Sequence, residues 1–89
     1  FIEEVPTLMN QLDQALTTNN RAEAERASHT LKGNFRILQL QNQQTVWENI
    51  EKLAHEDELA QIPELVPEAK LISQQVVEQL KSTLDSRQL

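Results

Sequence analysis

The chain has 89 residues, a net charge of −6 and 38% hydrophobic residues, which is the composition of one small globular domain. It has no cysteine, which excludes disulfides and thiolate metal sites, and its single glycine excludes a glycine-rich phosphate loop. The negative charge argues against nucleic-acid binding, and no apolar run approaches the roughly 20 residues of a membrane span. We therefore expect no contact with either nucleic acid or membrane.

The first predicted helix covers residues 1–16, where apolar side chains recur at steps of three and four. Leucine, glutamine, glutamate and alanine dominate here and throughout the chain, and these residues favour helices. Pro6 lies inside the apolar pattern, so the helix either begins near Pro6 or is kinked there. Because the sequence opens in the middle of this pattern, we expect it to be cut from a longer polypeptide.

The second predicted helix covers residues 21–38 and follows a polar break at residues 17–20. Asn20 is placed to cap it, because Glu23 follows three residues later in an approximate capping box. At about 100° per residue, one side of this helix is apolar. That side is formed by Ala24, Ala27, Leu31, Phe35 and Leu38.

The third predicted helix covers about residues 40–55, with Val46, Ile50 and Leu53 facing inward. Trp47 is interpreted as a packing residue, and His55 as a surface residue at the polar end of the helix. The acidic residues 56–58 predict a turn and the start of another helix.

The fourth predicted helix has Pro63 and Pro67 near its beginning, which indicate a first turn or a kink. Its apolar positions are Ile62, Leu65, Ala69, Ile72, Val76 and Leu80. Linkers as short as those between the four helices place successive helices side by side. We therefore predict an all-α protein, an antiparallel up-down four-helix bundle that forms one domain over residues 1–89.

The second helix concentrates positive charge in an acidic chain. Four of the eight basic residues lie between positions 21 and 36, where only two glutamates oppose them. His29 points away from the apolar side, with Lys32 and Gly33 beside it and Arg36 two turns along. This pattern predicts an exposed imidazole close to two cations, and it suggests an anion that is bound or transferred.

A phosphoryl group fits these residues. Neutral imidazole is a nucleophile that can carry phosphorus on one ring nitrogen, while the other nitrogen donates a hydrogen bond that fixes the ring. Lys32 and Arg36 could offset the phosphoryl charge. Gly33 lies inside a helix, where glycine costs about 1 kcal/mol relative to alanine. The missing side chain beside His29 would let the backbone of another protein come close.

Residues 28–33, with the sequence SHTLKG, resemble the signature of histidine-containing phosphotransfer (HPt) domains, which reads approximately A/S-H-x-L-K-G. Arg36 matches a position that is often basic in that family, and Ile50 and Glu51 resemble its Leu-Glu/Gln pair. The resemblance covers nearly the whole chain. It implies that His29 accepts the phosphoryl group and that Lys32 and Arg36 stabilise it. It also implies that Glu51 orients the imidazole and that Gly33 lies in the docking surface.

The resemblance implies a phosphocarrier of a multistep two-component phosphorelay, with no turnover of its own. Such domains take a phosphoryl group from an aspartate of one receiver domain and pass it to an aspartate of another. The expected partners are receiver domains of response regulators or of a hybrid sensor kinase, and the receiver supplies Mg²⁺. We expect this chain to hold no cofactor and no metal and to be a monomeric domain. We also expect it to be cytoplasmic, either in a free protein or in the cytoplasmic part of a membrane-bound sensor kinase.

Two alternatives remain open. The first is a helical adaptor of the same fold that no longer transfers phosphate, and the second is the phosphotransfer module of a chemotaxis-type kinase. The sequence departs from the HPt pattern at Gln39, where a glycine is common, and at Gln43, where an apolar residue is usual. Leu40 is either an apolar docking contact near His29 or lies where the helix has already turned away.

Overall fold

The computed structural model describes residues 3–87, with side chains for residues 3–83. It contains four α-helices, α1 (Glu4–Thr17), α2 (Arg21–Ile37), α3 (Gln41–His55) and α4 (Val66–Arg87), and a 3₁₀ helix η1 (Leu59–Glu64). No strand occurs among residues 3–87. The prediction of an all-α protein with four long helices is confirmed.

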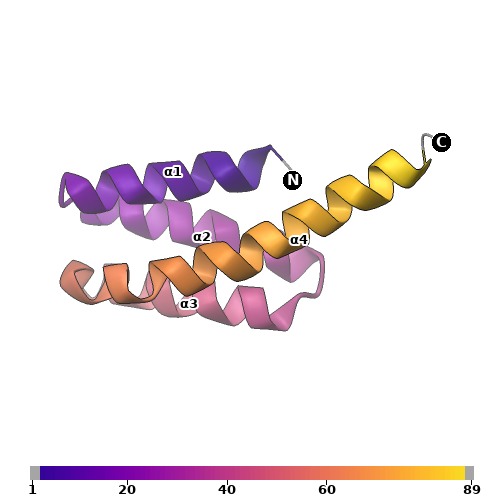
Figure 1. Cartoon of the computed structure of the whole chain (residues 1–89). Coiled ribbons are helices and arrows are strands. Elements are labelled where there is room, and N and C mark those ends of the chain that lie inside the picture. The colour runs from indigo at the N-terminus through magenta and orange to yellow at the C-terminus, as the bar shows by residue number, and fades with distance from the viewer. Residues whose placement is uncertain (1–2, 88–89) are drawn as a thin grey trace.

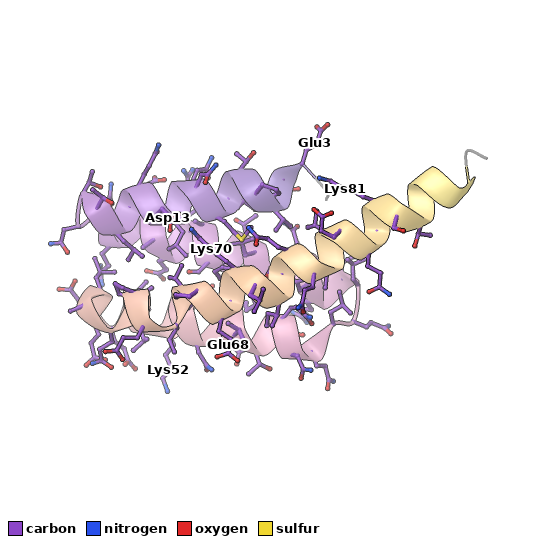
Figure 2. All side chains as sticks on the ribbon, viewed as in Figure 1. Glu3, Asp13, Lys52, Glu68, Lys70 and Lys81 are labelled. Atoms are coloured by element: carbon purple, nitrogen blue, oxygen red, sulfur yellow. The ribbon has the colours of Figure 1, made fainter. Side chains whose placement is uncertain are left out.

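The helices form an elongated bundle that measures 47 × 23 × 19 Å (Figure 1). α2 packs against α1 on one side and against α3 on the other, and α4 lies across α1 and α3. The C-terminal part of α4 extends past the ends of the other helices (Figure 1). One ion pair, between Lys70 and Asp13, joins α4 to α1 (Figure 2). No helix in the described part of the chain is long and apolar enough to cross a membrane.

The helix starts decide between the two alternatives for Pro6, in favour of a helix that begins near it, and correct the prediction for residues 56–58. α1 begins at Glu4, so Pro6 lies in its first turn, where a missing N–H costs nothing, and no kink is needed. The acidic residues 56–58 do form a turn, but they do not start the last long helix. η1 follows them and contains Pro63, and α4 begins only at Val66, with Pro67 in its first turn. Proline at position 63 suits a short 3₁₀ segment, because few backbone donors are needed there.

The helix ends explain one departure from the HPt pattern. Two residues after the ends of α1, α2 and α3, the backbone enters the left-handed region, at Asn19 (φ 54°), Gln39 (φ 58°) and Asp57 (φ 60°). At each end the next residue donates its N–H to a carbonyl five residues back, as Leu40 does to Phe35 at 3.0 Å. Asparagine and aspartate tolerate this conformation well, whereas glutamine does not. Gln39 therefore carries backbone strain at the position where a glycine is common in HPt domains.

The core lies between the helices and is almost entirely aliphatic. Trp47 is fully buried, as predicted, and its Nε1 donates a 2.8 Å hydrogen bond to the buried Ser73 Oγ of α4. Ile50 is fully buried, whereas Val46 and Leu53 are only partly buried. The prediction that Leu38 faces the core is wrong: α2 ends at Ile37, and Leu38 is 41% exposed.

Candidate functional site

The position of His29 follows from the register of α2. The helix is capped by Asn20, whose Oδ1 accepts the Glu23 N–H at 3.2 Å, as the sequence predicts. Its apolar side is buried at Ala24, Leu31 and Phe35. The side chain of His29 consequently lies on the opposite side of the helix and is 69% exposed.

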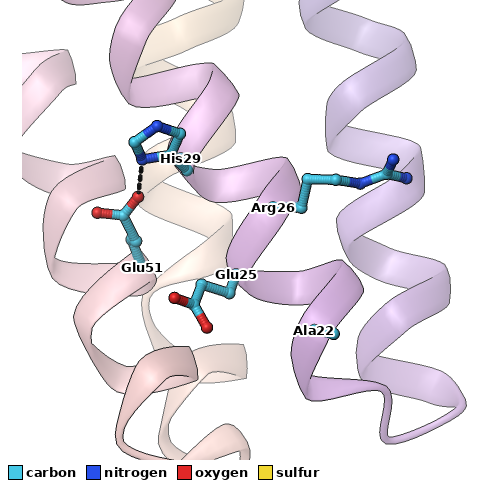
Figure 3. A pocket seen from close by; sticks show the side chains of 5 residues that line it. All are labelled: Ala22, Glu25, Arg26, His29 and Glu51. Carbon is cyan, nitrogen blue, oxygen red and sulfur yellow. Dashed lines mark hydrogen bonds and ion pairs between the residues drawn. The ribbon is translucent and has the colours of Figure 1, made fainter.

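Glu51 of α3 faces His29 and binds it. The Nδ1 atom of His29 contacts the Oε2 atom of Glu51 (Figure 3). A carboxylate can only accept a hydrogen bond, so Nδ1 carries the hydrogen and Nε2 keeps its lone pair. Figure 3 shows Nε2 on the far side of the ring, pointing away from Glu51. The ring is thus fixed in one tautomer, with its nucleophilic nitrogen directed outward.

Lys32 binds the same carboxylate. Its Nζ donates a 2.8 Å hydrogen bond to Glu51 Oε1, and the side chain of Glu51 is only 18% exposed. Partial burial raises the pKa of the Glu51 carboxyl, but the hydrogen bonds and charges of Lys32 and His29 outweigh it and hold this pKa below 4.5. Glu51 is therefore ionised at neutral pH. The sequence places Lys32 beside His29, but it does not reveal that Lys32 is held by Glu51.

A shallow hollow of about 390 Å³ opens beside His29 on the outer face of the bundle (Figure 3). It is lined by Ala22, Glu25, Arg26, His29 and Glu51. The hollow is too open to enclose a small molecule, because small-molecule sites bury most of their ligand. Its shape suits the surface of another protein.

A second histidine–glutamate pair lies one helical turn from the first. His55 Nδ1 is 3.1 Å from Glu25 Oε1, and the backbone carbonyl of His55 accepts a 3.0 Å hydrogen bond from Arg21. His55 is exposed, as predicted, but the sequence analysis missed its partner. The signal was available: Glu25 precedes His29 by four residues and His55 follows Glu51 by four, so neighbouring helices of opposite direction bring both pairs together.

The other candidate residues lie around the same face of α2. A side chain at Gly33 would meet no atom within 4 Å, so packing within the bundle does not require a glycine there. Arg36 is exposed and forms no ion pair within the described part of the chain, whereas Arg26 is bound to Glu23 at 2.5 Å. Leu40 packs against the core after the end of α2, so it is not an apolar contact beside His29.

Among the described residues, no three metal-ligating side chains lie together. The two histidines each contact a glutamate of the neighbouring helix, so each forms an acid–imidazole pair. Such a site can hold one imidazole in a fixed tautomer and present its free nitrogen to an electrophile.

The comparison with known families agrees with this geometry. The family described as Hpt domain matches residues 1–86, which include α1, α2, α3 and all of α4 except its last residue. No curated protein and no solved structure matched the chain. The chain therefore belongs to the Hpt domain family, whose members act in histidine phosphotransfer of two-component signalling and interact with receiver domains.

Proposed function

We propose that this chain is a phosphocarrier of a multistep phosphorelay and that His29 carries the phosphoryl group between aspartates of receiver domains. The observation that supports this most directly is the exposed imidazole whose Nδ1 is held by Glu51 and whose Nε2 is directed outward. The open hollow beside the ring gives room for a receiver domain to approach.

The transfer balances without an added proton carrier. The Nε2 lone pair of His29 attacks the phosphorus of the receiver's phosphoaspartate, an N–P bond forms and the P–O bond to aspartate breaks. The aspartate leaves as a carboxylate. Nδ1 keeps its hydrogen, so the ring gains a positive charge, and the ionised carboxylate of Glu51 stabilises that charge across the hydrogen bond. Transfer to the next receiver is the reverse of these steps.

Lys32 and Arg36 supply the positive charge for the transferred group in this proposal. Lys32 is one turn after His29 and is held by Glu51, from which its flexible ammonium can turn to the phosphoryl oxygens. Arg36 lies about 10 Å along α2 from His29, at 1.5 Å per residue, so it acts at longer range. Gly33 lies between His29 and Arg36 along α2, and its missing side chain lets a receiver domain approach the helix closely.

We infer further that residues 1–89 form one domain, an antiparallel up-down bundle. The two histidine–glutamate pairs support opposite directions for α2 and α3. The earlier residue of α2, Glu25, contacts the later residue of α3, His55, whereas His29 contacts the earlier Glu51. We also propose that the domain is a monomer and acts in the cytoplasm, either free or as part of a hybrid sensor kinase, with Mg²⁺ supplied by its receiver partner.

Incubation with a receiver domain phosphorylated on its aspartate tests the proposal. Label should pass to this chain, be acid-labile and alkali-stable, and disappear in His29→Gln. His55→Gln is the matched control and should accept label as the wild type does.

Label that persists in His29→Gln would contradict the assignment. A chain that binds receivers but never accepts label would instead be an adaptor. Labelling by an ATP-dependent kinase domain alone, with no receiver involved, would identify a chemotaxis-type module.

A further inference from the structure

Ile37 is the most exposed large hydrophobic residue among the described side chains. It is 80% exposed, compared with 57% for Leu71 and 41% for Leu38. It is also the last residue of α2. Because its side chain is not buried against the core, isoleucine contributes little to the stability of the helix end. Most of its apolar surface is therefore free to contact another molecule.

Ile37 lies two turns after His29 on α2, displaced to one side of it. Eight residues separate them, which corresponds to about 12 Å along the helix axis and a rotation of about 80°. Gly33 lies between them and has no side chain, and a Cβ there would meet no atom within 4 Å, so the surface at this position is bare. This part of α2 thus presents the imidazole of His29, the bare position of Gly33 and the apolar side chain of Ile37.

The same end of α2 carries an unneutralised cation. Arg36 is exposed and has no ion-pair partner in the described part of the chain, although the whole chain has a charge of −6. A partner that docks here should therefore combine an apolar patch with negative charge. A receiver domain brings the negative charge of its phosphoaspartate to His29, so it is the partner expected on this surface.

We propose that Ile37 is the apolar anchor of the receiver-docking surface, an inference that rests on the proposed function. A standard protein interface covers about 800 Å² on each partner, or a radius of about 16 Å, so a receiver centred on His29 reaches Ile37. Because Ile37 lies about 12 Å further along the axis of α2 than His29, it adds affinity for the receiver and takes no part in the phosphoryl transfer itself.

The test is the rate of phosphoryl transfer from a phosphorylated receiver to this chain, measured against receiver concentration for Ile37→Ser and for Leu71→Ser. Leu71 is an exposed leucine of α4 and is the matched control. We expect Ile37→Ser to raise the half-saturating concentration about tenfold, because the apolar contact is lost, and to leave the rate at saturation unchanged. Leu71→Ser should match the wild type, and Ile37→Leu should keep most of the affinity.

Three results would overturn the inference. Equal half-saturating concentrations for Ile37→Ser and Leu71→Ser would show that Ile37 is not a docking contact. A lower rate at saturation with unchanged affinity would place its effect in the transfer step. No transfer to the wild-type chain would contradict the proposed function as well, so failure of the two proposals can be told apart.

Discussion

Two histidine–glutamate pairs join α2 to α3, and their geometry is similar while their surroundings differ. In each pair a glutamate carboxylate holds Nδ1 of an exposed histidine on the neighbouring helix. His29 and His55 are 69% and 73% exposed, so access to solvent does not separate them. The differences lie in charge and in the space next to each ring.

The pair at His29 has cations and bare surface beside it, which would favour a bound phosphoryl group. Lys32 binds its glutamate, Gly33 leaves the neighbouring surface bare, and Arg36 follows on the same face. The pair at His55 is followed directly by the three acidic residues 56–58, which would repel a phosphoryl group. In the proposed function, a carboxylate on Nδ1 does not by itself mark the phosphoacceptor, and the neighbouring cations and bare surface distinguish His29 from His55.

The largest expected effect comes from filling the bare surface beside His29. Gly33→Arg should lower the transfer efficiency by about 10-fold to 100-fold, because a long side chain there keeps the receiver away from the ring. Gly33→Ala is the matched control. It should leave transfer nearly unchanged and stabilise the fold by about 1 kcal/mol, since its methyl group meets no atom and glycine is unfavourable in a helix.

Transfer kinetics and urea unfolding of both variants check this prediction. Unchanged transfer in Gly33→Arg would remove Gly33 from the docking surface.

Removal of the cation beside the first pair should have the next largest effect. Lys32→Ala should slow transfer about tenfold, because a hydrogen bond to a charged group contributes about 1.5 kcal/mol. Lys52→Ala, on the exposed side of α3 next to Glu51, is the matched control and should transfer at the wild-type rate. Stopped transfer reactions with a phosphorylated receiver measure both rates. Equal rates for the two variants would show that Lys32 has no special place in the site.

The ion pairs of Glu51 predict a pH dependence of stability. Because the pKa of Glu51 is held below 4.5 in the folded chain, these ion pairs stabilise the fold above that pH. Their contribution is lost as the pH falls below 4.5 and through the lowered pKa of Glu51. The wild type should therefore exceed Glu51→Gln in the free energy of unfolding at neutral pH, and the difference should shrink in acid.

Urea unfolding of both chains at several pH values measures that difference. A difference that does not shrink as the pH falls below 4.5 would contradict the lowered pKa of Glu51.

A substitution of Gln39, which follows the end of α2 and belongs to neither histidine–glutamate pair, should have the smallest effect on phosphoryl transfer. Gln39→Gly should raise the free energy of unfolding by about 1 kcal/mol, because it removes the strain of a left-handed glutamine. Asn19→Gly is the matched control and should gain less, since asparagine tolerates that conformation. Thermal unfolding of both variants measures the gains. A loss of stability in Gln39→Gly would mean that the glutamine side chain contributes more than its backbone costs.

The sequence predicts most of the helices and the exposure of His29, because apolar spacing and the Asn20 cap determine the register of α2. It does not predict η1, since a short 3₁₀ segment has no periodic pattern of its own. It also cannot show that Lys32 binds Glu51, because that contact depends on how closely α2 and α3 approach. The Glu25–His55 pair lay within reach of the sequence, once His29 was placed opposite Glu51.

The proposed transfer depends most on which ring nitrogen carries the phosphoryl group. Nuclear magnetic resonance of the chain with ¹⁵N-labelled histidine, after transfer from a phosphorylated receiver, identifies that nitrogen by its coupling to phosphorus. We expect phosphorus on Nε2 of His29, with Nδ1 still protonated and facing Glu51. Phosphorus on Nδ1 of His29, or on either nitrogen of His55, would contradict it.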